Sequence, residues 1–562
     1  MKSLRGLNWE VSNKLKPGMK KNPRDEIISA LLENRGINTK KKKEEFINPE
    51  KPENISLKNI GINFSEMKKA IKRIKKALKE NEKTVIYGDY DADGVCATAI
   101  LWESLYAAGF NVIPFIPERF SEGYGLSDTG VEKLKKDIPD LKLIITVDNG
   151  ITAVAAVKKA FSLGIDVVIS DHHQEGKSIP KAAAIVHTTK LSGAGIAWFL
   201  AREIENTFDK KCGWGHLDLA AIGTVADQVP LLSANRSLVK YGIDFLHKTK
   251  RPGLKALFDE AGIKIKKGGK IGVYEIGYVI APRINAMGRL GHAIDSLRLL
   301  CTKDKVRAEK LSRLLSGTNR KRQEIVEEVI TRTRLFIKSK KWEGVIVVSD
   351  KSYHEGVIGL AASKIVEEFY RPAVVISEGK EISKASARSI SGFNIIKAIK
   401  ETDDLIKEGG GHPMAAGFTL KTENIEKFIE KLGIISARDL TDDILAKKIK
   451  IDLQIEFNLL SLDLAERILF FEPTGIGNPA PVFVTKNVNV INAKLVGSQG
   501  KHLKLVLEKD GKLTEAIAFG FGDFSNEILR KPPLDVVYNL EKNIWNGEEN
   551  VQLKIKDIRI CK

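Results

Sequence analysis

Three aspartates within five residues are the clearest sign of chemistry in this sequence. Asp89, Asp91 and Asp93 follow the apolar, β-branched run 85–87 and precede Gly94. Such a run is typical of a buried strand, and a glycine among acids is typical of the turn that leaves it. Carboxylates this close repel one another unless water or a cation lies between them. The stretch therefore predicts either a metal site at a strand end or a solvated acidic turn.

The pattern Asp-x-Asp-x-Asp-Gly is also the first half of a calcium-binding EF-hand loop. The twelfth position of that loop must be a bidentate glutamate, and here it is Ile100. The segment that enters the turn has the pattern of a strand, whereas an EF-hand loop is entered from a helix. We therefore exclude the calcium loop.

Two further predicted strands end in residues that bind metals. Residues 143–147 lead to Asp148, and residues 167–170 lead to Asp171-His172-His173. Histidines at a strand end are often ordinary surface or capping residues, but strands and helices alternate here, which predicts a doubly wound parallel sheet. In such sheets ligands bind beyond the carboxyl ends of the strands, so these turns should line one edge.

The residue types indicate which metal this edge would hold. Many carboxylates around one imidazole suit Mn²⁺ or Mg²⁺ better than zinc, which prefers more histidine or cysteine. So many acids also suggest two ions that share a carboxylate, about 3.5–4 Å apart. Two such ions can activate a water and stabilise a phosphoryl transition state. This chemistry predicts phosphoester hydrolysis without a covalent intermediate.

Composition agrees with an anionic substrate. The 562 residues carry a formal net charge of +19, which favours nucleic acid, although a lysine-rich proteome gives the same excess. The length predicts three or four domains. Four scattered cysteines and the lack of a signal sequence or an apolar run of membrane length predict a cytoplasmic protein with no membrane partner.

The sequence after the third predicted strand end indicates four further segments. A helical region from 193 to about 300 contains Asp227 at the end of an apolar helix. A long connecting helix covers 303–340, with residues 316–318 as its candidate break. A second, smaller α/β segment spans 342–432. From about 449, short alternating strands predict a β-barrel.

These motifs together resemble the DHH phosphoesterase superfamily. The motifs that carry the resemblance are D-Y-D-A-D-G, V-D-N-G, S-D-H-H and V-A-D, and G-G-G-H-P-M-A-A-G resembles the associated DHHA1 domain. The segments I-P-E-R-F-S-E-G-Y-G-L, A-P-R-I-N-A-M-G-R-L-G and G-I-G-N-P-A-P-V-F are most similar to the bacterial single-stranded-DNA exonucleases within it. The resemblance covers nearly the whole chain.

The resemblance implies a division into five parts. They are an N-terminal basic region (1–50), a DHH domain (51–300), a connecting helix (301–341), a DHHA1 domain (342–448) and an OB-fold (449–562). It implies a 5′-to-3′ exonuclease of DNA repair and recombination that releases mononucleotides from single-stranded DNA with two Mn²⁺ or Mg²⁺ ions. Its partner is single-stranded DNA with a 5′ end, and a single-strand-binding protein or a helicase is a candidate protein partner.

The resemblance also implies roles for residues around the metals. Asp91, Asp148 and Asp89 would hold one ion, with Asp89 either a ligand or a support for Asp91. The other ion would be held by Asp93, Asp148, His172 and Asp227, so Asp148 bridges the two. His173 would contact the scissile phosphate, and Asp171 would orient a histidine rather than bind metal.

A further set of residues would hold the DNA. Arg119, Ser386 and Arg388 resemble a terminal-phosphate pocket, although Arg388 alone could be a salt-bridge residue. Arg283 and Asn285 resemble residues that approach the scissile phosphate, and His354 and His412 resemble residues that face the cleft. The backbone of 409–411 is a candidate anion-binding nest or a tight turn. Four barrel aromatics are candidates for base stacking or for the core: Phe483, Phe519, Phe521 and Trp545.

Two other functions remain open at this point. A phosphodiesterase of short oligonucleotides or cyclic dinucleotides would use the same motifs, but it needs neither a long basic chain nor a barrel. A non-catalytic DNA-binding relative would have lost metal ligands, and here every expected ligand position is filled.

Overall fold

The computed structural model describes residues 3–14, 23–119, 122–123, 125–208, 214–264, 271–339, 344–545 and 547–561. The chain forms two compact units. One consists of 39–320 with 471–479, and the other of 1–38, 321–470 and 480–562. The five-part division by sequence stays a prediction.

A five-stranded parallel sheet forms the first part of the unit 39–320. The strand order is β3-β2-β4-β5-β6, and every neighbouring pair is parallel. The strands are β2 (Lys83–Tyr87), β3 (Val112–Phe115), β4 (Leu141–Val147), β5 (Asp166–Asp171) and β6 (Ala184–His187). The predicted parallel sheet is confirmed, and the strands that precede the acidic turns, β2, β4 and β5, lie side by side.

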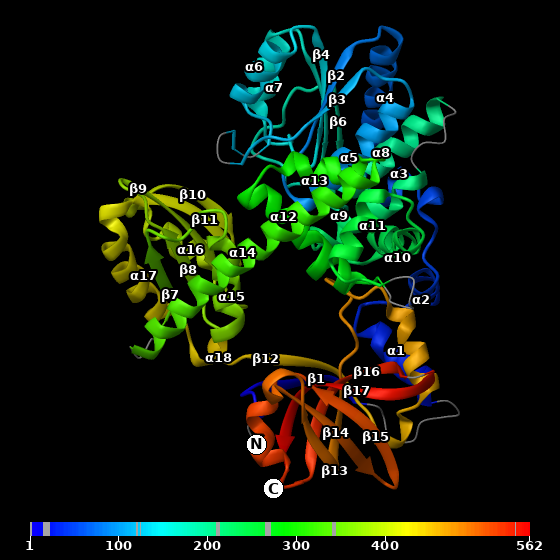
Figure 1. The fold of residues 1–562 in the computed structure, drawn as a ribbon, viewed down its shortest axis with the longest axis vertical. Helices are drawn as coiled ribbons and strands as arrows, with labels where there is room; N and C mark the ends of the chain where they lie inside the picture. Colours follow the sequence, from blue (N-terminus) through cyan, green and yellow to red (C-terminus); the bar gives the residue numbers. More distant parts are fainter. Residues whose placement is uncertain are drawn as a thin grey trace. The chain divides into compact units, whose positions relative to one another are not determined.

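Helices cover both faces of this sheet, as a doubly wound fold requires. Val85 and Tyr87 of β2 pack with α6 (Asp128–Asp137) and α7 (Val154–Ser162), whereas Ile86 packs into the opposite core. That core is formed with α4 (Phe64–Lys79), α5 (Ala92–Ala107) and α8 (Gly193–Phe208). Figure 1 shows the two helical layers on either side of the strands.

The rest of this unit is helical, as the sequence predicts. Its helices are α2 (Lys40–Ile47), α3 (Leu57–Ile60), α9 (Leu217–Ala226), α10 (Ser233–His247), α11 (Pro252–Glu260), the π-helix η4 (Glu275–Ile280), α12 (Ala281–Leu290) and α13 (Ala293–Cys301). The connecting helix α14 runs unbroken from Lys305 to Ser339, so the candidate break at 316–318 is wrong. Ser316 is buried, and Thr318 Oγ1 donates to the Leu314 carbonyl (2.9 Å), so packing outweighs the modest cost of a helical glycine.

The second α/β segment has a mixed sheet of order β10-β11-β9-β8-β7, in which only β7 and β8 are parallel. The strands are β7 (Ile346–Asp350), β8 (Ala373–Ser377), β9 (Ile382–Arg388), β10 (Ile406–His412) and β11 (Ala415–Lys421). The helices are α15 (Ile358–Phe369), α16 (Ile395–Lys400), α17 (Ile425–Asp439) and α18 (Asp442–Leu445). Residues 409–411 are paired strand residues of β10, so the predicted nest is wrong: an extended strand does not converge its N–H groups.

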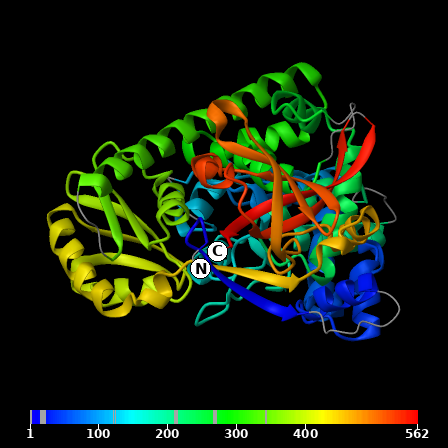
Figure 2. The ribbon, with the colours of Figure 1, turned by 90° about the horizontal axis from the view of Figure 1, so that it is seen from below.

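The last segment closes into a five-stranded barrel, which confirms the predicted OB-fold. Its strands are β13 (Phe483–Val496), β14 (His502–Lys509), β15 (Lys512–Ala518), β17 (Glu548–Ile560) and β16 (Leu534–Trp545), and β16 pairs back with β13. The pair β15–β17 is parallel and the others are antiparallel. The barrel strands are orange to red in Figures 1 and 2.

Further elements adjoin this barrel. They are the parallel pair β1 (Asn8–Lys14) and β12 (Lys448–Gln454), and the helices α1 (Pro23–Glu33), α19 (Leu462–Ile468) and α20 (Ser525–Ile528).

Of the candidate stacking aromatics, Phe483 and Phe521 are fully buried, which favours the core, and Phe519 is exposed. The side chain of Trp545 lies outside the described residues. Among the helices of the described ranges, none combines the length and apolar composition needed to cross a membrane.

Buried Arg236 of α10 ties residues 471–479 to the helical region. Its guanidinium donates to the carbonyls of Phe46 (2.8 Å), Phe471 (3.0 Å), Glu472 (2.8 Å) and Pro473 (3.2 Å). Only 1% of the residue is exposed, and burial lowers its pKa to about 10. A guanidinium carries five N–H donors in one plane, whereas an ammonium carries three, so a lysine cannot reproduce all four of these contacts.

The substitution Arg236→Lys should therefore destabilise the protein. It keeps the charge but leaves at least one of the four carbonyls unpaired, at a cost of about 1–3 kcal/mol for each buried carbonyl without a donor. Urea unfolding should show a lower midpoint, and residues 471–479 should become sensitive to proteolysis. The control Arg307→Lys, on the exposed face of α14, should leave both measurements unchanged. Equal midpoints for the two variants would contradict the role of Arg236.

Candidate active site

The turn after β2 is held by two side chains. Asp91 is the N-cap of α5, and its Oδ1 accepts hydrogen bonds from the backbone N–H of Asp93 (2.9 Å) and Gly94 (3.0 Å). Asn285 Oδ1, from α12, accepts from the N–H of Ala92 (2.6 Å). Because these N–H groups would have no partner within the helix, both side chains fix the start of α5 and the aspartates on it.

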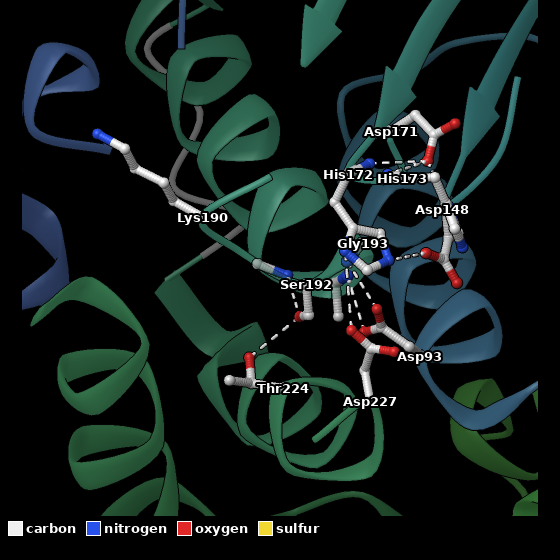
Figure 3. Close-up of polar contacts among 12 residues, drawn as sticks. Asp93, Asp148, Asp171, His172, His173, Lys190, Ser192, Gly193, Thr224 and Asp227 are labelled. Atoms are coloured by element: carbon white, nitrogen blue, oxygen red, sulfur yellow. Dashed lines mark hydrogen bonds and ion pairs between the residues drawn. The ribbon is translucent and has the colours of Figure 1, made fainter. Parts of the chain in front are cut away.

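Asp93 is held by the first residues of another helix, α8. Its Oδ2 accepts from the N–H of Gly193 (2.6 Å) and its Oδ1 from the N–H of Ala194 (2.9 Å), as Figure 3 shows. The N-terminus of a helix favours a negative charge. The sequence analysis missed this contact, for which the only signal was the small-residue run 192–195 at the start of a helix.

Two glycines allow the close approach around Asp93. A Cβ on Gly193 would overlap Asp148, and a Cβ on Gly223 of α9 would overlap Asp93. Glycine is therefore needed at positions 193 and 223 because a Cβ would not fit there, and not because of the backbone conformation.

The imidazole of His172 contacts acids from two other elements (Figure 3). Its Nε2 lies 3.1 Å from Asp148 Oδ1, and its Nδ1 lies 3.7 Å from Asp227 Oδ2, at the end of α9. Asp148 follows β4 in a left-handed conformation (φ 63°), which turns the chain sharply at the end of the strand. The three residues are far apart in sequence, but their side chains meet.

Asp171 is almost fully buried and is used for support. Its oxygens accept from the N–H of Ile151 (2.9 Å), the N–H of His172 (2.7 Å) and Nδ1 of His173 (2.8 Å). Burial alone would raise the pKa of Asp171, but these hydrogen bonds and the charge of His173 hold it below its usual value. The geometry agrees with the predicted orienting role, and the histidine it orients is His173.

The ligand atoms gather into three groups, within each of which all atoms lie within 4.8 Å of one another. The groups are Asp89, Asp91 and Asp148; then Asp93, His172 and Asp227; and finally Asp148, His172 and His173. Asp148 occurs in two of the groups. It also contacts His172, which also belongs to the remaining group, that of Asp93 and Asp227. The structure thus brings together all six predicted ligands. The group of Asp93, His172 and Asp227 does not include Asp148, which the resemblance places there, although Asp148 contacts His172.

The pKa values of the buried carboxyl groups indicate that the site lacks positive charge. Burial and the neighbouring carboxylates raise the pKa of Asp89 to about 8 and that of Asp227 to about 7. The same causes raise the pKa of Asp93 and Asp148. Burial, with the nearby His173, lowers the pKa of His172 to about 4, which keeps the imidazole neutral, the form that binds metal.

One buried carboxylate oxygen is direct evidence that this site binds a cation. Asp89 Oδ1 is buried and has no hydrogen-bond donor among the described residues. A buried carboxylate oxygen without a donor is costly unless a cation meets it. Oxygen ligands with one neutral imidazole are also the donors that Mn²⁺ and Mg²⁺ accept, so the residues present fit divalent ions.

Two arginines lie beside the acidic turn. The guanidinium of Arg119 is 5.2 Å from the ring centre of Tyr90, and its charge acts on Asp89. The charge of Arg289, which the sequence analysis did not single out, also acts on Tyr90. Arg283 donates to the carbonyl of Val279 (2.6 Å) and to Ser316 Oγ (3.2 Å), and it joins none of the three metal groups.

The other predicted DNA-binding residues belong to the second unit. Arg388 Nη1 donates to Ser386 Oγ (3.1 Å), and a Cβ on Gly359, in the first turn of α15, would lie 3.1 Å from Arg388 Nη2. Among the described residues Arg388 forms no ion pair, so the salt-bridge alternative finds no support. An arginine beside a helix N-terminus suits a phosphate. His354 and His412 are both exposed.

Comparisons with known proteins agree with this site. Three families match: the DHH family, N-terminal domain (residues 83–224), the DHHA1 domain (343–434) and the RecJ OB domain (451–557). The single-stranded-DNA-specific exonuclease RecJ of Bacillus subtilis is 34% identical, over 95% of this chain and 68% of its own. That of Escherichia coli is 31% identical, over 88% and 90%. The crystal structure of Thermus thermophilus RecJ with Mn²⁺ has a TM-score of 0.81 at 29% identity, over 99% and 80%.

Gly193→Ala should weaken binding of Mn²⁺ at least tenfold, because the added Cβ would displace Asp148 and disturb the bonds from α8 to Asp93. Titration calorimetry measures this directly. The matched control is Gly433→Ala in α17, where a Cβ meets no atom within 4 Å. If both variants bind Mn²⁺ like the parent, the close packing at Gly193 does not position the site.

The raised pKa of Asp89 predicts how stability depends on pH without metal. A carboxyl with a raised pKa binds protons more tightly in the folded state, so the free energy of unfolding falls as pH rises from about 4 to about 8. In EDTA, Asp89→Asn should be more stable than the parent at pH 8, and the gain should shrink toward pH 4. Urea unfolding measures it, with exposed Asp259→Asn as control. A variant less stable than the parent at pH 8 would refute the prediction.

Proposed function

The chain belongs to the RecJ family of DHH phosphoesterases, and on this premise we propose that it is a metal-dependent exonuclease specific for single-stranded DNA. The observation that carries the proposal is the meeting of six ligand residues from separate elements around Asp148. A non-catalytic relative would not need this set of buried, mutually repelling carboxylates. The net charge of +19 agrees with a polyanionic substrate.

Two Mn²⁺ or Mg²⁺ ions would bind at this cluster. Asp89, Asp91 and Asp148 would hold one, and Asp93, His172 and Asp227 would hold the other, with Asp148 shared between them. Bound there, divalent ions supply activation of water and stabilisation of charge on the phosphoryl group.

His173 would act on the DNA itself. Burial lowers the pKa of the His173 imidazole, but its hydrogen bond to Asp171 and the negative charges of nearby aspartates together raise it above its usual value, which favours a protonated ring. A protonated imidazole donates to phosphate oxygens. We assign the contact with the scissile phosphate to the other ring nitrogen of His173.

The remaining groups would hold the strand. Arg283 and Asn285 would approach the scissile phosphate, His354 and His412 would contact the strand as well, and Arg119 would take part in binding the terminal phosphate. Arg388, oriented by Ser386, would bind a 5′-terminal phosphate, which sets a 5′-to-3′ direction. A single-strand-binding protein or helicase as partner, and a cytoplasmic location, remain predictions.

The test is digestion of a single strand labelled at either end. With Mn²⁺, the 5′ label should appear at once as a mononucleotide, whereas the 3′-labelled strand should shorten progressively; blunt duplex should persist. Asp148→Asn should reduce the rate at least a thousandfold, because both ions lose a ligand. The matched control is Asp259→Asn, which should digest like the parent. Release of the 3′ label first, or consumption of dinucleotides alone, would contradict the proposal.

A further inference from the structure

Two tyrosines, one directly before the π-helix η4 and one on it, form an exposed aromatic surface. Tyr274 and Tyr278 are 65% and 73% exposed, and their rings stack with centres 5.1 Å apart and planes at 27°. Rings this exposed gain little from the fold, and exposed aromatic clusters commonly mark binding surfaces. A π-helix is itself uncommon and occurs frequently at functional sites.

The opposite side of η4 explains why the rings face outward. Ile276 and Ile280 are fully buried, and a Cβ on Gly277 would lie 3.6 Å from Val225 of α9. The inner side of η4 therefore packs on the helix that ends at Asp227. The outer side carries the tyrosine pair.

The helix that follows the tyrosine pair contacts the turn that carries the candidate metal ligands. η4 runs directly into α12, and Asn285 of α12 binds the N–H of Ala92 at the start of α5. The α-helical rise of about 1.5 Å per residue is an upper limit for the π-helical part, so Tyr278 and Tyr274 lie at most roughly 10 Å and 16 Å from Asn285 along the axis. The tyrosines thus stand within a few nucleotides of the metal ligands.

A second apolar group extends the surface. Ile476 is 54% exposed, and its carbonyl accepts from the N–H of Leu231, four residues after Asp227. A Cβ on the neighbouring Gly475 would lie 3.9 Å from Val273, which precedes the tyrosine pair. The segment 475–479, which the proposed chemistry does not use, therefore lies beside η4.

We propose that Tyr274 and Tyr278 form a platform on which bases of the single strand stack as it leaves the metal site. This inference rests on the proposed function. Every base has a flat π-face, so an aromatic platform accepts any sequence, as an exonuclease requires. Bases in a duplex are paired and stacked on one another, so the platform also favours single strands.

The test compares the double variant Tyr274→Ala/Tyr278→Ala with the parent by fluorescence anisotropy in EDTA, which prevents hydrolysis. The probes are a 5′-phosphorylated oligothymidylate and an abasic strand of equal length. The double variant should bind oligothymidylate roughly tenfold more weakly, the loss expected for stacked bases, and should bind the abasic strand with the parent's affinity. Tyr274→Phe/Tyr278→Phe should restore binding because it keeps both ring faces.

The chain offers a matched control. Tyr106 is 64% exposed and stacks on Trp102 with centres 5.3 Å apart and planes at 25°. It lies on α5, about 22 Å along the helix from Asp91. Tyr106→Ala removes an equally exposed, equally stacked ring and should leave binding unchanged.

The possible outcomes separate this inference from the proposed function. A parent that neither binds nor digests single strands would refute the proposed function. A parent that does both, together with a double variant of unchanged affinity, would refute the platform alone. Equal losses on the abasic and normal strands would also refute it, because the contact would then be with the backbone. A loss in Tyr106→Ala as large as in the double variant would do the same.

Discussion

Mutual repulsion among buried carboxylates is the constraint on which this structure depends. Asp89, Asp93 and Asp148 are each at most 2% exposed, and burial raises the pKa of all three. Such a cluster is unfavourable for folding on its own, since charges removed from water need partners of opposite sign. The fold supplies partial positive charge from the first turns of α5 and α8. The remaining deficit is the charge that two divalent ions bring.

The architecture follows from this constraint. A parallel sheet ends its neighbouring strands at one edge, so residues that follow β2, β4 and β5 meet without long loops. The start of α8 and the end of α9 then close the site from the side. Their approach depends on Gly193 and Gly223, where any side chain would overlap an aspartate. The buried charges of this site lower the stability of the fold, a trade-off between stability and activity that is common in enzymes.

Local patterns predicted most of the fold and most of the candidate metal ligands, because an apolar run, its acids and its turn are adjacent in sequence, whereas Asp227 was assigned through the family resemblance. Contacts between distant segments could not be predicted. No pattern in the sequence shows that Asn285 caps α5 or that the N–H of Gly193 holds Asp93. The candidate helix break at 316–318 was wrong because burial of Ser316 outweighs the propensity of a glycine. The nest at 409–411 was wrong because strand pairing takes up those residues.

The two-ion site can be tested by measuring metal binding to the purified protein. Titration calorimetry with Mn²⁺ at neutral pH, in two buffers of different ionisation enthalpy, gives both the number of ions and the protons released. The raised pKa values of Asp89 and Asp227 mean that binding must expel protons. We expect two Mn²⁺ ions to bind per chain, with net release of protons. A single ion, or binding without proton release, would contradict this expectation.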